Sequence, residues 1–353
     1  MKILVYGAGA IGGYLGAKLA LAGHDLTIID MEVTAGLIND DGLHITEGGQ
    51  TAVVHPTAYP SVAALFMGDP PTFDLILMGM KSYHLAEAVN PLAAFNANPP
   101  HIMTIQNGID VEQPLVEQFG AECLIAGSFT TPISKESSNR LVVEHSGRGL
   151  ALASPAGQDV RQWVNLFNQA GVKTIRAKNY EAMKWSKALL NIVGNATAAI
   201  LNRRPGVIYK SAAMFDVELR MLQEMLAVMK KKGIPVMDLP GSPAKKLATA
   251  VTRVPKALLK PILTKQVVGG RGDKMPSFQI DLVNGAGNSE VQFHNGAIAR
   301  HGAAVGVLTP VNAVLNEVLM KLTRQELDWR EFDGRPNKLL AEIGQYEKNA
   351  LSR

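Results

Sequence analysis

The sequence has one cysteine, Cys123, among its 353 residues. A single cysteine excludes a disulfide within the chain and is typical of a reducing compartment. No stretch of about 18 uninterrupted apolar residues occurs, so we expect no membrane-spanning helix. The first residues also lack the charged region and apolar core of a secretory signal. These absences favour a cytoplasmic protein.

Strong net charge is also absent from most of the chain. The formal net charge is +4, and residues 245–274 alone carry +7, from eight basic residues and one aspartate, so the remainder sums to −3. A basic charge confined to one segment does not indicate a general nucleic-acid-binding surface. We therefore expect neither nucleic acid nor a membrane as a partner. No Cys/His spacing typical of a metal site occurs, so we expect no metal.

The pattern of apolar residues changes once along the chain. Residues 1–177 alternate short apolar runs with helical segments, which predicts a doubly wound parallel sheet, a Rossmann-type α/β domain. Over residues 178–353, apolar residues recur at helical spacing and strand patterns disappear. The length also exceeds that of one typical domain. We therefore predict an α/β domain over 1–177 and an all-α domain over 178–353.

A glycine-rich turn follows the first predicted strand, Lys2–Tyr6. Gly7, Gly9 and Gly12 give the spacing G-x-G-x-x-G after that strand and at the start of a predicted helix. The first glycine permits the tight turn, the second lets the backbone approach a pyrophosphate, and the third lets helix and strand pack closely. The helix N-terminus then offers free N–H groups to phosphate. The predicted dinucleotide-binding residues are Gly7, Ala8, Gly9, Ala10, Ile11 and Gly12.

The second predicted strand, Asp25–Asp30, ends on a carboxylate. Asp30 lies 18 residues beyond Gly12, where an acidic residue commonly accepts hydrogen bonds from the adenosine ribose. A carboxylate there would repel a 2′-phosphate and so favours NAD over NADP. An aspartate that caps a helix or a turn is an equal alternative.

Further apolar runs predict the remaining strands. Lys81 and Asn107 follow two such runs, Phe73–Met78 and Ile102–Ile105, and ligands of doubly wound sheets bind at the carboxyl ends of strands. Both residues are therefore candidate ligand contacts, although residues of a strand-terminal turn would look the same. A hairpin is predicted at Leu43–Thr46 and Thr51–His55, and the sheet is expected to continue through Leu124–Thr130, Leu141–His145 and Leu150–Ala153.

The predicted helix that begins at Tyr180 carries polar residues among apolar ones. Lys187, Asn191 and Asn195 recur every four residues and so share one face. Their neighbours are apolar nearly all round, as in a buried helix. A lysine and two asparagines buried there need partners or a ligand, and such a lysine can act as a general acid. A solvent-facing polar stripe is the alternative.

A second polar stretch lies at residues 275–296. Ser277 could donate a hydrogen bond to a carboxylate, and Glu290 could bind or orient a hydroxyl. From the pattern alone, each is more often an ordinary helix cap or surface residue. The stretch becomes informative only together with the preceding motifs, as part of a family resemblance.

Together these motifs resemble those of the ketopantoate reductase (2-dehydropantoate 2-reductase) family over essentially the whole chain. The first motif is shared by many dehydrogenases, whereas the combination in this order is much more specific. The matching segments are GAGAIG at 7–12, MKS at 80–82, QNG at 106–108, WSKALLN at 185–191 with Asn195, PSFQID at 276–281 and EVQFHNGAIARHG from Glu290.

The resemblance implies a Rossmann domain, a C-terminal helical domain like that of 6-phosphogluconate dehydrogenase, and an active site in the cleft between them. By similarity, Lys187 is the general acid that protonates the keto oxygen. Glu290 would hold the hydroxyl end of the substrate, assist proton delivery and border the cofactor. No metal is implied.

The resemblance also assigns binding roles to five polar residues. Asn191 and Asn195 would bind polar groups of the substrate, and Ser277 would bind its carboxylate. Asn107 and Lys81 would lie beside the nicotinamide of the cofactor, and Asn107 would also contact the substrate.

Two features depart from the family pattern. In the family, the second strand usually leads to an arginine or similar group that favours NADP. In this sequence the corresponding stretch, residues 29–32, carries two acidic residues, Asp30 and Glu32, and no basic one. NADP is therefore expected from the resemblance and NAD from Asp30. Residues 234–274 are also longer and more basic than the usual connection. We expect them to form a solvated helical lid or an oligomer contact, or a gate for a larger or more acidic keto acid; a peripheral membrane contact is the least favoured alternative.

We therefore expect an NAD(P)H-dependent reductase of a small 2-keto acid. Its first candidate substrate is ketopantoate, reduced to pantoate in pantothenate biosynthesis. One alternative is the same lysine and glutamate chemistry on a different 2-keto acid. Another is a non-catalytic dinucleotide-sensing protein of the same fold. A homodimer is a possible assembly.

Overall fold

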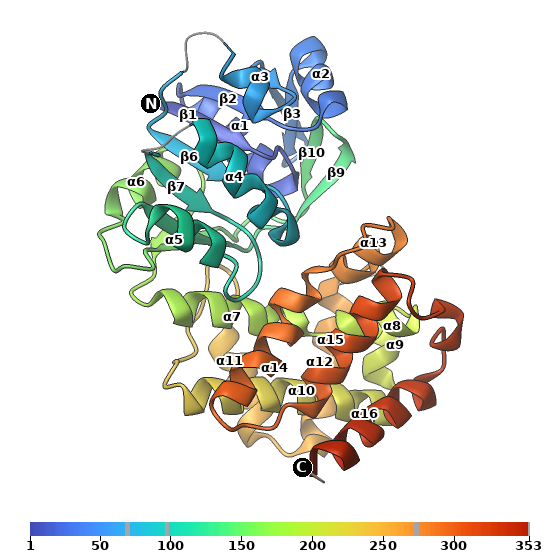
Figure 1. The fold of residues 1–353 in the computed structure, drawn as a ribbon. Coiled ribbons are helices and arrows are strands. Elements are labelled where there is room, and N and C mark those ends of the chain that lie inside the picture. The colour runs from blue at the N-terminus through green and yellow to red at the C-terminus, as the bar shows by residue number, and fades with distance from the viewer. Residues whose placement is uncertain (68–70, 96–98, 272–274, 352–353) are drawn as a thin grey trace. The chain divides into compact units, whose positions relative to one another are not determined.

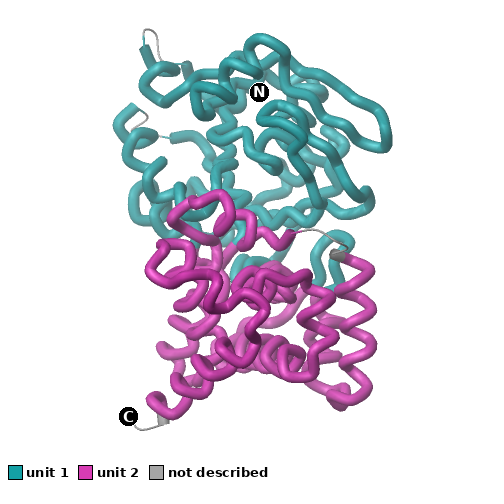
Figure 2. Tube along the Cα trace, turned by 90° about the vertical axis from the view of Figure 1, so that its right-hand side faces the viewer, with its two compact units in different colours: residues 1–107, 111–184, 238–243 teal, residues 108–110, 185–237, 244–353 magenta. Residues whose placement is uncertain are grey.

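The computed structural model describes residues 1–67, 71–95, 99–271 and 275–351, which divide into two compact units (Figures 1 and 2). Unit 1 comprises residues 1–107, 111–184 and 238–243, and unit 2 comprises residues 108–110, 185–237 and 244–353. Each unit is thus assembled from separated stretches of chain. Residues 272–274, the end of the predicted basic segment, lie outside the described residues.

Unit 1 is built on an eight-stranded sheet of order β12-β11-β8-β7-β6-β1-β2-β5. Its neighbouring strands are parallel, except that β8 and β11 are antiparallel. The strands are β1 (Lys2–Tyr6), β2 (Asp25–Ile29), β5 (Thr57–Tyr59), β6 (Leu75–Met78), β7 (His101–Thr104), β8 (Leu124–Phe129), β11 (Leu150–Ala153) and β12 (Thr174–Arg176). The predicted doubly wound, largely parallel sheet is confirmed.

Helices cover both faces of this sheet, as the alternation of side chains along β1 shows. Ile3 and Val5 join a core with α1 and α6, whereas Leu4 joins the opposite core with α3, α4 and α5. Each central strand is therefore buried on both sides. The helices of this unit are α1 (Ala10–Leu21), α2 (Glu32–Asp41), α3 (Val62–Leu65), α4 (Leu85–Phe95), α5 (Gln113–Phe119) and α6 (Arg161–Gln169), with the short 3-10 helix η1 (Ser82–His84).

A separate four-stranded sheet of order β4-β3-β10-β9 also belongs to unit 1. Its strands are β3 (Leu43–Glu47), β4 (Gln50–Val54), β9 (Ile133–Ser137) and β10 (Arg140–Val143). The predicted β3–β4 hairpin is confirmed. The prediction that Leu141–His145 extends the main sheet is wrong, because β10 pairs with β3. In β10, Leu141 is buried beside the exposed Arg140, as in a strand with one solvated face, whereas β8 and β11 are buried throughout.

Unit 2 is helical, and α15 lies at its centre. This helix packs against α8, α10, α14 and α16. Its buried residues include Val311, Leu315, Leu319 and Leu322, which recur at helical spacing along it. The helices are α8 (Ala196–Leu201), α9 (Pro205–Lys210), α10 (Ala212–Lys231), α11 (Ala244–Arg253), α12 (Lys256–Arg271), α13 (Ser277–Val283), α14 (Asn295–Ala304), α15 (Pro310–Thr323) and α16 (Pro336–Leu351), with the 3-10 helices η2 (Glu290–Phe293) and η3 (Trp329–Glu331). No helix of the described ranges is long and apolar enough to cross a membrane.

Helix α7 (Tyr180–Ile192) is shared, since its residues through Lys184 count with unit 1. The prediction that Asn195 lies on the same helix as Lys187 and Asn191 is wrong. Gly194 adopts a left-handed backbone conformation with φ of 56°, and Asn195 is the N-cap residue of α8. Asn195 therefore does not continue the stripe of Lys187 and Asn191, although its side-chain amide donates to the Asn191 carbonyl at 3.2 Å.

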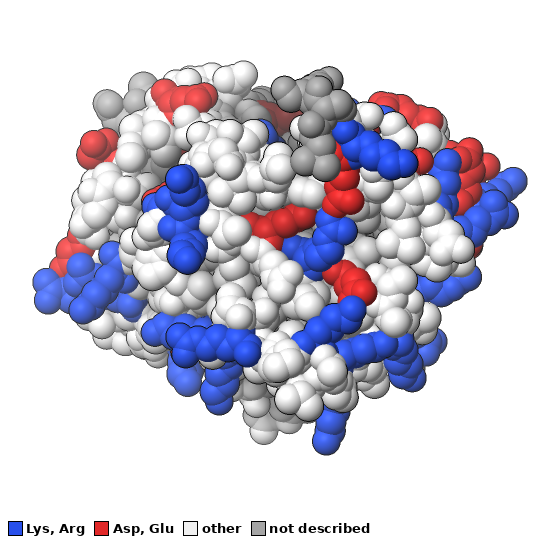
Figure 3. Space-filling model, turned by 90° about the horizontal axis from the view of Figure 1, so that it is seen from below, with Lys and Arg blue, Asp and Glu red and all other residues white. Residues whose placement is uncertain are grey.

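The basic segment forms the helices α11 and α12, and α12 packs against α9. One stripe of α12, with Leu259 and Leu263, is buried, while Leu258 and Ile262 are exposed. An open groove of about 670 Å³ lies here, lined by Lys210, Lys260, Pro261, Thr264, Lys265, Val268 and Gly269. Figure 3 shows one face of the molecule, on which basic side chains lie among uncharged ones along the lower edge of the view. The lid, gate and contact roles of this segment stay predictions.

Candidate active site

The glycine-rich turn packs directly against the end of β6. Gly7 has a φ of 95°, and a Cβ atom on it would lie 2.6 Å from the backbone nitrogen of Met80. A Cβ atom on Gly12 would collide with the Gly7 carbonyl oxygen and lie 2.9 Å from the Cα of Gly79. Only glycine fits these two positions, as expected for the turn and for close packing of helix on strand.

The N-terminus of α1 is open to an anion. Its N-cap residue is Gly9, no side chain caps it, and its first turn carries no acidic residue. The first N–H groups of a helix have no partner within the helix, and they carry the positive end of its dipole. These residues therefore fit the pyrophosphate of a dinucleotide, which such helix ends bind.

Asp30 bridges the end of β2 to the glycine-rich turn. Its Oδ2 accepts the backbone N–H of Ala8 at 2.6 Å, and its Oδ1 accepts that of Met31 at 2.8 Å. The N-cap residue of α2 is Met31, so Asp30 does not cap that helix. It does bond to the glycine-rich turn, which was the other alternative that the sequence left open. The carboxylate lies against the turn, the position at which dinucleotide-binding folds bind the adenosine ribose.

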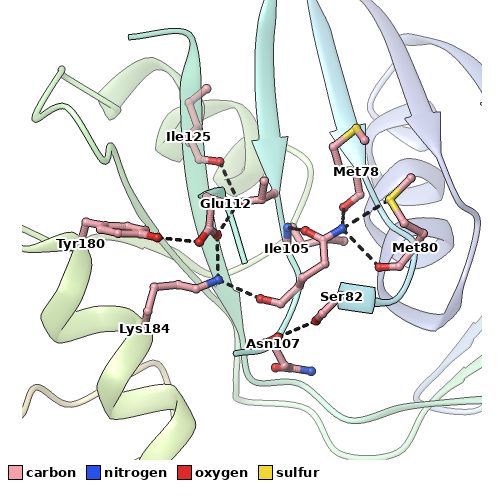
Figure 4. Close-up of polar contacts among 11 residues, drawn as sticks. Met78, Met80, Ser82, Ile105, Asn107, Glu112, Ile125, Tyr180 and Lys184 are labelled. Atoms are coloured by element: carbon pink, nitrogen blue, oxygen red, sulfur yellow. Dashed lines mark hydrogen bonds and ion pairs between the residues drawn. The ribbon is translucent and has the colours of Figure 1, made fainter. Parts of the chain in front are cut away.

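The QNG and MKS motifs meet at the ends of β7 and β6 (Figure 4). The Gln106 amide donates to the carbonyl oxygens of Met78, at 2.9 Å, and Met80, at 3.2 Å. Ser82 Oγ donates to the Asn107 carbonyl at 2.6 Å. The Asn107 side chain is half-buried and points away from this network in Figure 4.

Lys81, also half-buried, directly precedes Ser82 and is the N-cap residue of η1. Lys81 and Asn107, both predicted to lie beside the nicotinamide, thus adjoin the hydrogen bonds that join the ends of β6 and β7.

A buried ion pair that sequence analysis missed anchors α7 to this region. Lys184 Nζ lies 2.8 Å from Glu112 Oε1 and donates to the Gln106 carbonyl at 2.8 Å (Figure 4). The Lys184 and Glu112 side chains are only 3% and 2% exposed. The hydroxyls of Tyr180, at 2.5 Å, and Thr104, at 2.8 Å, also donate to the carboxylate. The available signal was a second lysine one helical turn before Lys187.

The two lysines of α7 therefore differ in setting. Lys184 is enclosed and holds two acceptors of the protein, whereas Lys187 is half-buried. A group that protonates a substrate must be reachable by it. This contrast favours Lys187 as the proton donor.

Asn195 and Ser277, two of the predicted substrate-binding residues, meet in unit 2. The Asn195 side chain donates to Ser277 Oγ at 3.1 Å and accepts the backbone N–H of Phe278 at 3.2 Å. Asn195 is buried and Ser277 is exposed. Asn195 thus holds the start of α13 while Ser277 lies at the surface of the unit.

His294 joins two further predicted residues and was missed in the sequence. Its Nδ1 lies 2.9 Å from the Glu290 carbonyl oxygen, and its Nε2 lies 3.3 Å from Asn191 Nδ2. Since a carbonyl only accepts, Nδ1 carries the proton and Nε2 accepts from Asn191. Glu290 itself is 5% exposed. The histidine stands four residues after Glu290 in the EVQFHNG motif, which was its only sequence signal.

No group of three or more histidine, cysteine, aspartate or glutamate side chains in the described part of the chain is arranged to hold a metal ion. The predicted site residues of unit 2 instead take part in hydrogen bonds near the ends of α7 and α8.

Comparison with known families identifies relatives of the whole chain. The family described as "Ketopantoate reductase PanE/ApbA" matches residues 3–157, and "Ketopantoate reductase PanE/ApbA C terminal" matches residues 179–323. The 2-dehydropantoate 2-reductase of Pyrococcus horikoshii is 29% identical over 89% of this chain and 95% of its own. That of Halobacterium salinarum is 24% identical over 92% of this chain and 100% of its own.

Solved structures show the same fold. A PanE/ApbA family ketopantoate reductase from Ralstonia eutropha aligns with a TM-score of 0.76 at 23% identity, over 92% of this chain and 99% of that one. A D-mandelate dehydrogenase bound to NADH and anilino(oxo)acetate aligns with a TM-score of 0.75 at 18% identity, again over 92% and 99%.

The family matches and the dinucleotide-binding fold make this protein an NAD(P)-dependent oxidoreductase. The chain belongs to the ketopantoate reductase family. The expected fold class and family are thereby confirmed. Of the alternatives left by the sequence, an enzyme is favoured over a non-catalytic dinucleotide sensor.

Proposed function

We propose that the protein reduces 2-dehydropantoate to pantoate. The observation that carries this proposal is the grouping in unit 2 of the polar residues that the family resemblance assigns to the substrate. Asn195 bonds to Ser277 and to the Asn191 carbonyl, and Asn191 contacts Glu290 through His294. The names of the relatives from Pyrococcus horikoshii and Halobacterium salinarum support the same substrate.

The proposed chemistry assigns one role to each group. The Lys187 ammonium donates a proton to the keto oxygen, where negative charge develops in the transition state. A positioned cation stabilises this charged transition state more than it stabilises the neutral ketone. Ser277 and Asn195 bind the carboxylate and polar groups of the substrate. Glu290 and Asn191 hold its hydroxyl end. When bound, the reduced nicotinamide supplies the hydride, and Asn107 and Lys81 orient it.

We further infer that NADH is preferred over NADPH. The Asp30 carboxylate is held at the glycine-rich turn by two backbone N–H groups, so its negative charge stays where a 2′-phosphate would lie. The residues that follow, Met31 and Glu32, offer no cation to such a phosphate. A structure of D-mandelate dehydrogenase, a neighbour in fold, contains NADH.

The deciding experiment is steady-state oxidation of NADH and of NADPH, in parallel, with 2-dehydropantoate as acceptor. Turnover with a higher kcat/KM for NADH is expected. Turnover with NADPH as the better donor would contradict only the cofactor preference. An absence of turnover with both would contradict the proposed substrate.

A different 2-keto acid is the second candidate, favoured by the fold similarity to D-mandelate dehydrogenase and by the basic α11–α12 segment. A panel of 2-keto acids with aliphatic, aromatic and dicarboxylate side chains tests it. A member of the panel with a kcat/KM well above that of 2-dehydropantoate would identify the true substrate class.

A further inference from the structure

We propose that the buried Lys184–Glu112 pair is a positioning device for Asn107. The pair holds the loop that carries Asn107 in one conformation and so sets the direction of its amide towards the nicotinamide. The inference rests on the proposed role of Asn107 and adds two residues that touch neither substrate nor cofactor.

One side chain of α7 joins both ends of the loop that carries Asn107. One ammonium, that of Lys184, bonds to both ends of the loop 106–112: to the Gln106 carbonyl at 2.8 Å and to Glu112 Oε1 at 2.8 Å (Figure 4). Glu112 is itself fixed by the hydroxyls of Thr104 and Tyr180. The loop is therefore closed by a single side chain from α7.

The loop between these ends contains residues in left-handed backbone conformations. Gly108 has a φ of 119° and Asp110 a φ of 62°, so two of its residues have left-handed backbone conformations. Such a loop has other accessible conformations unless surrounding contacts select one. Asn107 stands directly before Gly108, and Ser82 holds its carbonyl from the opposite side. Release of the Gln106 carbonyl would thus free one side of Asn107.

The energetics of a buried ion pair also favour a positioning role. Removal of one partner from a buried ion pair leaves an uncompensated charge and is strongly destabilising, whereas replacement of both by apolar residues is often neutral. A buried pair is therefore weak as a stabilising device. Its two bonds to the ends of the Asn107 loop give it a role in positioning instead.

The test replaces both charges, as Lys184→Met/Glu112→Met, and compares NADH with ADP-ribose, which lacks the nicotinamide. We expect ADP-ribose to bind with unchanged Kd. The thermal midpoint should fall, because the Gln106 carbonyl and the hydroxyls of Thr104 and Tyr180 lose buried partners. The kcat/KM for NADH should fall on the order of tenfold to hundredfold, the cost of a misplaced contact. Equal losses for NADH and ADP-ribose would overturn the proposal.

A double-mutant cycle with Asn107→Ala shows whether the pair acts through Asn107. In the Asn107→Ala background, loss of the ion pair should lower the kcat/KM for NADH by less than about a further twofold, because the side chain that the pair positions is gone. Effects that multiply instead would overturn the proposal. If Asn107→Ala alone keeps wild-type NADH kinetics, both the proposed role of Asn107 and the inference that rests on it are wrong. If Asn107→Ala lowers the kcat/KM for NADH but Lys184→Met/Glu112→Met does not, the inference about the ion pair is overturned and the proposed role of Asn107 stands.

The exposed pair Lys321–Glu317 on α15, at 2.6 Å, provides the matched control. Its double replacement by methionine should leave every readout unchanged. If Lys184→Met/Glu112→Met does not fold, Lys184→Gln/Glu112→Gln takes the same measurements. That variant keeps hydrogen-bonding groups at both positions, so we expect a smaller loss of kcat/KM for NADH and no change in the Kd for ADP-ribose. Unchanged NADH kinetics would overturn the proposal.

Discussion

The Glu218 carboxylate accepts the backbone N–H of Gly194 at 2.8 Å. Glu218 is fully buried on α10 and also accepts the hydroxyls of Tyr209, at 2.8 Å, and Thr197. Gly194 is the residue that breaks α7 from α8. Glu218 therefore fixes the turn immediately before Asn195, although it touches none of the predicted site residues in these bonds.

Glu218→Leu should raise the KM for the keto acid and leave the KM for NADH unchanged. A leucine accepts no hydrogen bond, so the Gly194 N–H and the hydroxyls of Tyr209 and Thr197 lose their acceptor and the turn before Asn195 shifts. An unsatisfied buried group costs about 1–3 kcal/mol, which also lowers the thermal midpoint. Steady-state kinetics with each substrate varied in turn measures the split. Glu317→Gln, at an exposed position, is the control, and an unchanged KM for the keto acid would refute the assignment.

Lys187→Ala should lower kcat by about two to four orders of magnitude, the usual contribution of a general acid. The Kd for NADH and the thermal midpoint should change little, because Lys187 is half-buried and outside the Lys184–Glu112 pair. Lys178→Ala, an exposed lysine just before α7, serves as the control. A kcat near that of wild type in Lys187→Ala would exclude it as the proton donor.

Asp30→Ser should shift cofactor preference towards NADPH. The substitution removes the carboxylate that would repel a 2′-phosphate and loses charge-assisted acceptance of ribose hydroxyls, an interaction worth about 1.5–3 kcal/mol. The kcat/KM for NADH should therefore fall at least about tenfold while that for NADPH rises. Glu32→Gln, in the exposed first turn of α2, should leave the ratio unchanged. An unaltered ratio in Asp30→Ser would show that another group sets the preference.

The contact between Asp110 and His301, 2.8 Å apart, should make stability depend on acid pH. Burial alone would raise the pKa of the Asp110 carboxyl. The hydrogen bond from His301 and the charges of Arg300 and Lys232 outweigh burial and hold this pKa below its ordinary value of 3.8. A lowered carboxyl pKa stabilises the fold above the ordinary value, and this contribution is lost as the pH falls through the lowered one.

Asp110→Asn removes that contribution. Its thermal midpoint should be below that of wild type at pH 7, and the difference should disappear as the pH falls below about 4. Thermal unfolding of both proteins between pH 7 and pH 3 measures it. A difference that stays constant over this range would mean that the ionised carboxylate does not stabilise the fold.

Most strands of the main sheet could be predicted, because apolar runs such as Ile3–Val5 and Leu75–Met78 are buried on both faces and leave an unambiguous pattern. The three-residue strand β5 was not predicted, and of its residues only Ala58 is buried. The position of β10 could not, since a half-buried strand shows its alternation but not its neighbour. Helix α16 was predicted only as part of the all-α domain 178–353, without bounds of its own; its buried apolar residues are Leu339 and Ile343.

The candidate site was predictable only where residues close in sequence share a helix or motif. Lys187 and Asn191 follow from helical spacing, and Gly7 to Gly12 from a local turn. The Lys184–Glu112 pair joins residues 72 positions apart, and Gly194 takes its conformation beside a carboxylate 24 residues away. Nothing in the local sequence encodes such partners, because tertiary packing brings them together.

The interleaving of the two units limits how relatives of this enzyme could exchange halves by recombination. Residues 108–110 count with unit 2, and residues 238–243 return to unit 1, where the Pro240 carbonyl accepts Thr130 Oγ1 at 2.7 Å. The chain thus alternates between units in six stretches. A hybrid gene with one crossover near residue 184 would give each unit a foreign piece. A hybrid that keeps both units whole requires five crossovers, one at each change of unit.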